Sequence, residues 1–406
     1  MGDNKRKPDI RFQGFTDDWE QRKVTELGEI YIGLVTTMTS HYTDHGALLI
    51  RNSDIKDGRF EFGDKPIYLD DEFAKQNASR KHKVGDVITV HTGDIGTSAV
   101  ITEKEAGSIG FATIVTRPDK EKITSEYLCA YLNTDTHKNF AMNISTGDGR
   151  NNYNLKDYYE CVVPVPSIAE QRKISSFIDE LNNLITLQQR KYDKLVNVKK
   201  SMLEKMFPRE GAKVPEIRFE GFTDDWEQRK LGECFTERKD SMPEGELISV
   251  TIGEGIKKFS ELGRHDNSND DKSKYKKVCV GDIAYNSMRM WQGASGYSPY
   301  EGIVSPAYTV LSPITDVVDS KCISYLFKRS DMTHVFQMNS QGITSDNWNL
   351  KYPALSEIEI MVSPYLAEQH KIAAYLSRID NLITLQQRKL EKLKNIKKSM
   401  LEKMFV

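Results

Sequence analysis

Few residues of this chain have the types and spacing that catalysis or metal binding requires. His41 and His45 flank Asp44 at an interval that occurs in metal sites. The surrounding "TSHYTDHGALLI" predicts a turn that enters a strand, where side chains four residues apart do not converge as they do on a helix. We therefore expect ordinary solvated histidines here and predict no metal site.

The carboxylates of "SEIEI" at 356–360 alternate as they would on an exposed strand, which disfavours a paired nuclease site. The sequence contains no G-x-x-x-x-G-K-[ST] phosphate loop, no H-E-x-x-H helix and no G-x-S-x-G elbow. The absence of these motifs shifts the balance from catalysis toward binding as the class of function.

Two loops carry side chains suited to reading DNA. "HTGDIGTS" at 91–98 and "NSMRMWQG" at 286–293 each follow a "VGD" strand. Amide, hydroxyl and guanidinium groups read base edges in the major groove. The alternative, which composition alone favours, is a set of ordinary polar turns between strands. The candidate DNA contacts are Arg51, Asn52, His91, Thr92, Arg150, Asn151, Asn152, Asn286, Ser287, Arg289, Gln292, Gln341, Thr344 and Ser345.

Composition bounds these possibilities. The net charge of −2 indicates no nucleic-acid partner by itself, so a DNA-binding surface must be local. The five cysteines are scattered, which favours reduced thiols in the cytoplasm over a disulfide framework. Neither a signal peptide nor a membrane-spanning run is evident, and we expect a soluble cytoplasmic protein.

The elements that position these loops occur twice. "IRFQGFTDDWEQRK" at 10–23 returns as "IRFEGFTDDWEQRK" at 217–230, and we name these segments the boxes. Their Asp17–Glu20 and Asp224–Glu227 spacings predict a helix cap with its capping-box partner. "LITLQQRK" and "KSMLEKMF" also each occur twice, at 184–191 and 382–389, and at 200–207 and 398–405. The chain is therefore built from two half-molecules.

Between box and helix lie two variable stretches, roughly 31–163 and 233–362, which we name the first and second heads. Short β-branched runs such as "DVITV", "ATIVT" and "AYTVL" predict strands. "SEYLCAYLNTDTHKNFAM" and "SKCISYLFKRSDMTHVFQM" predict one helix each. Each head is thus expected to be a mixed α/β domain.

Each half ends in a predicted helix of about 40 residues, roughly 60 Å long. The first begins at Ser167 with Glu170 and ends before Pro208, and the second begins at Ser363 with Pro364 as its first helical residue. Both carry a heptad-like apolar stripe. The predicted helix–helix packing residues are Ile174, Ile178, Leu181, Ile185, Tyr192, Leu195, Met202, Ile372, Leu376, Ile379, Ile383, Leu390, Leu393 and Met400.

A helix this long with one apolar stripe needs a partner, and the other copy is the natural one. Because only residues 208–216 separate the first helix from the second box, the second helix must run back beside the first. The predicted fold is two mixed α/β domains joined by two antiparallel helices in a coiled-coil strut, a dumbbell with an internal pseudo-two-fold repeat. Phe405 then finishes near the first box. The expected boundaries are 1–166, 167–208, 209–363 and 364–406.

The whole arrangement resembles the DNA-specificity subunits of type I restriction–modification enzymes. The resemblance covers nearly the full chain and rests on the twin boxes, the "VGD" strands, "NYNLK" and "NWNLK", and "VPVPSIAEQRKI" and "VSPYLAEQHKI". It implies two target-recognition domains that each read half of a bipartite double-stranded DNA target, with the helices setting the gap. It also implies no catalytic site and no cofactor in this chain, two methyltransferase partners that carry S-adenosylmethionine, and restriction subunits that join the complex in defence against foreign DNA.

Two other classes stay open. A methyltransferase or nuclease in its own right is disfavoured because "NPPY"-like and "FxGxG"-like motifs are missing. A coiled-coil adaptor that never touches DNA would need the helices but not the loops.

Overall fold

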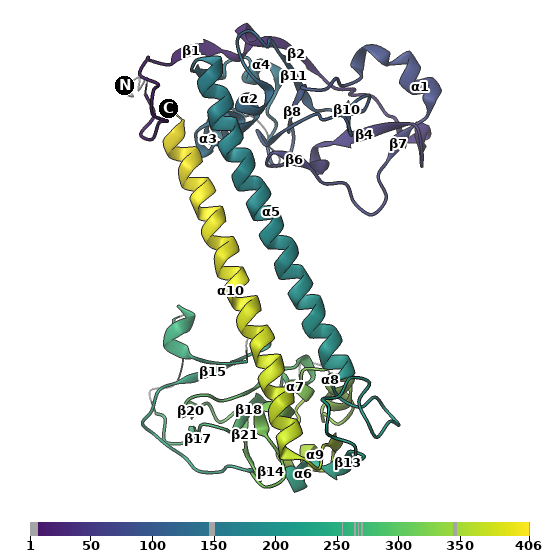
Figure 1. Ribbon diagram of the computed structural model, residues 1–406, viewed down its shortest axis with the longest axis vertical. Helices are drawn as coiled ribbons and strands as arrows, with labels where there is room; N and C mark the ends of the chain where they lie inside the picture. The colour runs from purple at the N-terminus through teal and green to yellow at the C-terminus, as the bar shows by residue number, and fades with distance from the viewer. Residues whose placement is uncertain are drawn as a thin grey trace. The chain divides into compact units, whose positions relative to one another are not determined.

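The computed structural model describes residues 7–145, 151–253, 255–263, 265–266, 268, 271–343 and 347–405. The chain divides into two compact units, Met1–Gln189 with Arg388–Val406, and Arg190–Gln387. Each unit combines short strands, short helices and portions of both long helices (Figure 1).

The first unit is built on a four-stranded antiparallel sheet of β2 (Gly28–Ile32), β11 (Ile114–Pro118), β8 (Val87–Thr89) and β9 (Ser98–Val100), in that order. A second sheet has the order β10 (Ile109–Phe111), β4 (Ala47–Arg51), β7 (Tyr68–Leu69) and β3 (Tyr42–Thr43). Two further strand pairs are β1 (Glu20–Lys23) with β12 (Val162–Val165) and β5 (Ile55–Lys56) with β6 (Arg59–Phe60). The helices are α1 (Asp71–Gln76), α2 (Ser125–Leu132), α3 (Asp135–Ile144), α4 (Leu155–Tyr158) and the first part of α5 (Ile168–Lys205).

The second unit repeats this frame. Its main sheet has the order β14 (Phe235–Glu237), β21 (Tyr308–Pro313), β18 (Ile283–Asn286) and β19 (Ser295–Tyr297). The remaining strands form the pairs β13 (Glu227–Lys230) with β22 (Glu359–Val362), β15 (Ile248–Thr251) with β16 (Gly255–Lys258), and β17 (Lys276–Val278) with β20 (Gly302–Val304). The helices are α6 (Leu231–Cys234), α7 (Ser320–Leu326), α8 (Ser330–Met338), α9 (Tyr352–Ser356) and the first part of α10 (Leu366–Met404).

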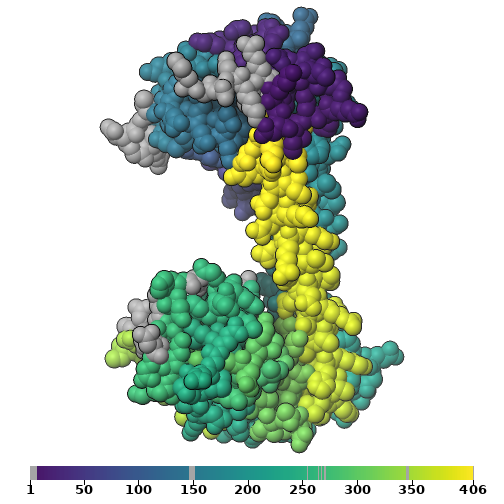
Figure 2. Space-filling model, turned by 90° about the vertical axis from the view of Figure 1, so that its left-hand side faces the viewer, coloured from purple at the N-terminus to yellow at the C-terminus, as the bar shows by residue number. Residues whose placement is uncertain are grey.

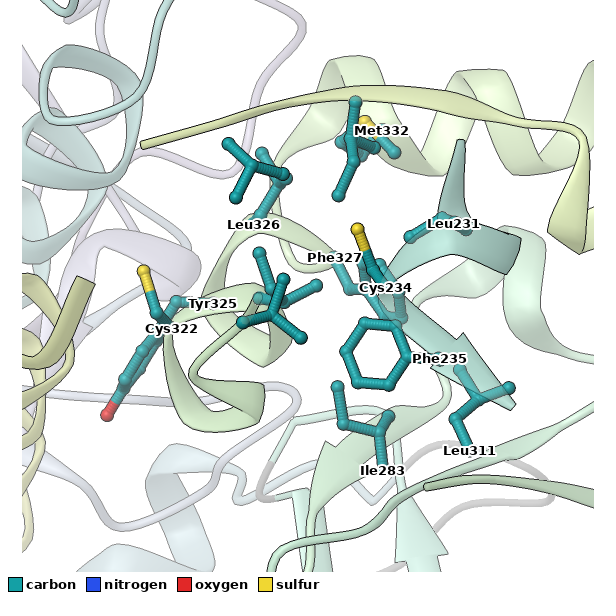
Figure 3. Close-up of a cluster of buried hydrophobic side chains, with 14 of the residues drawn as sticks. Leu231, Cys234, Phe235, Ile283, Leu311, Cys322, Tyr325, Leu326, Phe327 and Met332 are labelled. Carbon is teal, nitrogen blue, oxygen red and sulfur yellow. The ribbon is translucent and has the colours of Figure 1, made fainter. Parts of the chain in front are cut away.

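The two main sheets match strand for strand, and this confirms the predicted fold class of two mixed α/β units in an internal repeat. In the second unit, Phe235 of β14 lies among Ile283 and Leu311 of the sheet and Phe327 beyond α7 (Figure 3). The heads differ around this shared frame, because the sheet with β4 and β10 occurs only in the first unit among the described residues.

Each unit contains the start of one long helix and the end of the other. In the first unit, Ile174 and Ile178 of α5 share a core with Leu401 and Met404 of α10. In the second unit, Met206 at the end of α5 shares a core with Ile372 and Leu376 of α10. Within each unit the two helix segments therefore run antiparallel (Figure 1).

The residues predicted to pack between the helices are all buried or half-buried. Seven are buried: Ile174, Ile178, Leu181, Ile372, Leu376, Ile379 and Leu390. Seven are half-buried: Ile185, Tyr192, Leu195, Met202, Ile383, Leu393 and Met400. By contrast, Leu184 and Leu187 are exposed.

The chain ends inside the first unit, as the connectivity argument predicts. Phe405 contacts Trp19, Tyr127 and Tyr131, with ring centroids 6.4, 5.3 and 5.9 Å apart. The Ile10 N–H donates to the Lys403 carbonyl over 2.9 Å. The end of α10 (yellow) lies against the segment that contains the first box (purple) in the space-filling view (Figure 2).

Three local predictions are wrong. The boxes start no helix: Glu20 and Glu227 open strands β1 and β13, because their backbones pair with β12 and β22. The stretches 125–142 and 320–338 each form two helices rather than one; in the first, Thr134 caps α3 by accepting the His137 N–H. The second long helix begins at Leu366, two residues after Pro364.

Candidate nucleic-acid interface

The first candidate loop, residues 91–98, connects β8 to β9. The structure gathers four predicted contact residues around it. The His91 N–H donates to Asn52 Oδ1 over 2.8 Å, and the Thr92 hydroxyl donates to Asn152 Oδ1 over 2.9 Å. The Tyr153 N–H donates to the His91 carbonyl over 2.8 Å. Segments far apart in the sequence therefore form one polar cluster.

His91 enters this cluster as a neutral ring. Burial lowers the pKa of His91, so the imidazole acts at neutral pH as a hydrogen-bonding group and not as a cation. Its Nδ1 lies 2.7 Å from Thr92 Oγ1. The arrangement offers hydroxyl, imidazole and amide groups, which are the types that contact base edges.

Other predicted residues of the first unit are already engaged. Arg51 donates from Nε and Nη2 to the two carboxylate oxygens of Asp54, over 3.0 and 2.8 Å, and Asp54 is only 3% exposed. This pair fixes the orientation of the Arg51 guanidinium, although the Arg51 side chain is 38% exposed. The Asn151 amide donates to Met142 Sδ over 3.5 Å. Arg150 lies outside the described residues.

The second candidate loop, residues 286–293, connects β18 to β19 in the same place in the frame. Arg289 is exposed, and its Nη1 donates to Gln292 Oε1 over 3.3 Å. Asn286 Oδ1 accepts the Met288 N–H over 3.0 Å. Ser287 is buried, and its hydroxyl lies 2.8 Å from Thr309 Oγ1. Among the predicted residues of this loop, Arg289 is therefore exposed, whereas Asn286 and Gln292 are half-buried and Ser287 is buried.

A neighbouring segment lies against the second loop. The Leu350 N–H donates to the Ser287 carbonyl over 2.8 Å, and the rings of Trp291 and Trp348 meet edge to face at 5.2 Å. Gln341 is exposed and exchanges backbone hydrogen bonds of 3.0 and 2.8 Å with Asn349. The predicted Thr344 and Ser345 lie outside the described residues.

Ion pairs with buried aspartates fix the turn before each of the two strands that precede the loops. The aspartates of the two "VGD" turns, Asp86 and Asp282, are buried and form bidentate pairs with Arg117 and Arg238. Each aspartate also accepts a backbone N–H at the start of its turn, over 2.8 and 2.7 Å. The turn that leads into each loop strand is therefore fixed from two sides.

A second pair joins each box to its long helix. Arg11 donates to both oxygens of Glu170 over 2.7 and 2.8 Å, and Arg218 donates to those of Glu368 over 2.7 and 3.0 Å. Both glutamates are 1% exposed. The repeated "AEQ" in "SIAEQRKI" and "YLAEQHKI" is the sequence signal for this role, which side-chain chemistry alone did not reveal.

The histidines considered for a metal site do not converge. His41 Nδ1 lies 2.8 Å from Asp70 Oδ2, whereas His45 pairs with the exposed Asp44. Within the described ranges, no three His, Cys, Asp or Glu side chains are grouped closely enough to hold a metal ion. No helix in the same part of the chain combines the length and the apolar composition needed to cross a membrane.

Comparisons with known proteins give one consistent result. The sequence profile described as "Type I restriction modification DNA specificity domain" matches residues 16–197 and again 223–395. A Methanocaldococcus jannaschii protein assigned as the type I restriction enzyme MjaX specificity subunit is 23% identical over 399 residues, 95% of this chain and 92% of the relative. The EcoBI specificity subunit of Escherichia coli is 27% identical over 136 residues, 34% of this chain and 28% of that protein.

Solved structures share the fold. The type I restriction–modification S subunit from M. genitalium superposes with a TM-score of 0.58 at 14% identity, over 98% of this chain and 99% of the other. A chain from a structure that describes complex assembly and conformational transition of the type I system has a TM-score of 0.53 at 18% identity, over 95% and 97%.

Proposed function

Since the chain belongs to the family of type I restriction–modification DNA-specificity domains, we propose that it reads a bipartite double-stranded DNA target for a type I complex. Each head reads one half of the target, and α5 and α10 set the unread gap. The chain contributes specificity and no catalytic group of its own.

One observation carries this proposal: the two units have the same frame and differ at the loops. The sheets β2-β11-β8-β9 and β14-β21-β18-β19 have the same order, and a loop leaves each at the same place. In the first unit the neutral His91 imidazole of the loop lies beside the amides of Asn52 and Asn152, while the second loop carries Arg289 and Gln292. Equivalent positions with different hydrogen-bonding groups suit two different half-sites.

The repeated parts support the partners. The boxes differ only at Gln13 and Glu220, and both helices contain "LITLQQRK" and "KSMLEK", so the chain offers two similar surfaces, and repeated surfaces bind repeated subunits. We assign these surfaces to two methyltransferase subunits, which bring S-adenosylmethionine, and restriction subunits join through that assembly. The methyl transfer itself takes place in those partners.

The test is an assay of the purified chain, alone and with its methyltransferase subunits, on DNA with labelled S-adenosylmethionine. We expect label in the DNA only when the partners are present, and mapping of the methylated bases in a genome should give one split motif. Methylation by the chain alone would make it an enzyme. Assembly with the partners without any sequence-dependent DNA binding would make it an adaptor.

A further inference from the structure

We call the last residues of each candidate loop, where the chain leads back into the sheet, its return end. In both units a side chain just after a short helix forms hydrogen bonds with the backbone there. Asn133 and Lys328 stand at the same position counted from Ser125 and Ser320, the serines that open α2 and α7. Both side chains point at the loop backbone where the loop re-enters the sheet, although one is an amide and the other an amine.

In the first unit, Asn133 makes a two-point bond to one residue of the chain. Its Oδ1 accepts the Ser98 N–H over 3.0 Å and its Nδ2 donates to the Ser98 carbonyl over 2.8 Å. Ser98 is the last residue of the first loop and the first of β9. The Ser98 carbonyl also accepts the Gly58 N–H over 3.0 Å, from the turn between β5 and β6.

In the second unit, Lys328 makes the corresponding connection. Its Nζ donates to the Gly293 carbonyl over 2.7 Å and to the Ile252 carbonyl over 3.1 Å. Gly293 is the last residue of the second loop and has a φ of 80°, a left-handed conformation that favours glycine. Ile252 belongs to the turn between β15 and β16, a hairpin of this head.

The two junctions share a plan. Each joins the end of a frame helix, the return end of the loop, and a hairpin turn outside the shared sheet. Lys328 is half-buried, and this burial lowers the pKa of its amine to about 8, whereas Asn133 is 6% exposed. A buried hydrogen bond to a carbonyl fixes a loop end more firmly than an exposed one, because leaving it unmade costs desolvation.

We propose that Asn133 and Lys328 are positioning residues that set the geometry of the two DNA-reading loops, each for its own half-site. The inference rests on the proposed function, since it assumes that these loops read DNA. Neither side chain needs to touch a base. Each acts through the backbone whose direction it fixes, and a base contact displaced by about 1 Å loses much of its selectivity.

The experiment uses the full chain assembled with its methyltransferase subunits and three duplexes: the mapped target, and the target with either half replaced. We expect Lys328→Met to reduce the preference for the correct second half about tenfold, the size of one lost hydrogen bond, with the first half read normally. Asn133→Leu should do the converse. Lys274→Met, which removes an exposed lysine of the same unit, is the matched control and should change neither preference.

Affinity for unrelated DNA and its salt dependence separate positioning from charge loss, because a phosphate contact weakens binding to all sequences. Lys328→Arg, which still donates to both carbonyls, should restore the preference. Unchanged preferences in Lys328→Met, or an equal loss at both halves, would overturn the inference. If the methionine variant fails to fold, Lys328→Gln against Lys328→Arg decides in the same way. A wild-type complex that recognises no split target would instead reject the proposed function.

Discussion

Two histidines of the first unit are buried as neutral rings. The His137 Nδ1–H donates to the Leu132 carbonyl over 2.7 Å, Nε2 of the neutral ring accepts the Tyr153 hydroxyl at 3.2 Å, and His137 is wholly buried. His82 is 2% exposed. Burial lowers the pKa of each to about 4, against an ordinary value of 6.5. Both therefore resist protonation in the folded protein and accept a proton readily when it unfolds.

The difference between the folded and the unfolded pKa of these histidines predicts that acid destabilises the folded protein. Between pH 6.5 and about 4 the unfolded chain binds more protons, so stability is complete above pH 6.5 and falls as the pH falls. Each histidine accounts for up to about 3 kcal/mol over that window. Thermal unfolding from pH 7 to 4.5 should show a smaller loss for His137→Gln, whereas a substitution of the exposed His334 to glutamine should keep the wild-type slope. Equal slopes for both variants would contradict the assignment.

Arg289 is the exposed guanidinium of the second loop, so its loss should be selective. We expect Arg289→Ala to cost on the order of 1–3 kcal/mol in binding and to relax one position of the second half-site. Competition binding with duplexes that carry single-base substitutions measures this change in base preference. Arg378→Ala, which removes an exposed arginine of α10, is the control. A uniform loss across all sequences would identify Arg289 as a phosphate contact.

The side-chain types in the sequence indicated both candidate loops. They did not indicate which side chains form hydrogen bonds within the protein. Arg51 and Ser287 have the right groups for DNA, yet in the fold Arg51 pairs with Asp54 and Ser287 with Thr309. Such partners come from backbone geometry, which a single sequence does not encode locally. Asn133 and Lys328 carried no recognisable motif, because their role depends on where Ser98 and Gly293 lie.

At the scale of elements, long periodic segments were predictable and short ones were not. The helices α5 and α10 follow their apolar stripes over 38 and 39 residues. The four-residue strand β1 looks like a helix start in sequence, and only its pairing with β12 makes it a strand. Long elements are specified by their own periodicity, whereas short ones are decided by their neighbours.

The helices should set the gap between half-sites. Sequence places the middle of the first helix at Asn182–Asn183, but these residues line a cavity of about 690 Å³ with Asp57 and Gly58 of the first head. An insertion there would disturb that head, so the better sites follow Gln189 and Gln387. Inserting seven residues at each site keeps the apolar stripes in phase. It lengthens both helices by about 10 Å, which corresponds to about three base pairs of DNA.

Mapping of methylated bases measures the result. Both half-sequences should persist with a longer gap, whereas seven residues in only one helix should abolish recognition because the stripes no longer match. An unchanged gap in the double insertion would show that the helices do not act as a ruler.

At the scale of the whole molecule, the end of α10 lies beside the first box, so we expect the chain to tolerate circular permutation. Ile10 bonds to Lys403 within the first unit, and the Lys213 carbonyl accepts the Trp226 N–H over 2.8 Å. We expect a chain that joins residue 406 to residue 1 by a short flexible linker, and opens between Glu210 and Gly211, to keep its target. Methylation by the assembled permutant measures this, and a folded permutant that has lost its target would contradict it.

Phe207 follows the end of α5 and Phe405 follows the end of α10, and the two phenylalanines occupy equivalent places in the two units. Phe405 packs on Trp19 in the first unit, and Phe207 packs on Trp226 in the second at 6.0 Å. Alanine at either position should destabilise its own unit by about 3–5 kcal/mol. Amide hydrogen exchange should show faster opening around Trp19 for Phe405→Ala and around Trp226 for Phe207→Ala. The reverse assignment would mean that the helix ends do not complete these cores.

Completion of the first unit by the end of α10 has a consequence for synthesis on the ribosome. Trp19, Tyr127 and Tyr131 lack their partner Phe405 until that residue has been translated, an interval on the order of ten to forty seconds after Gln189 at roughly 5–20 residues per second. The second unit needs no such delay, because Met206 and Phe207 are made before its head and Leu376 soon after it. The unit whose translation begins first is therefore the last to complete its hydrophobic core. Until then, its unfilled apolar site is the surface to which a chaperone would bind on the nascent chain.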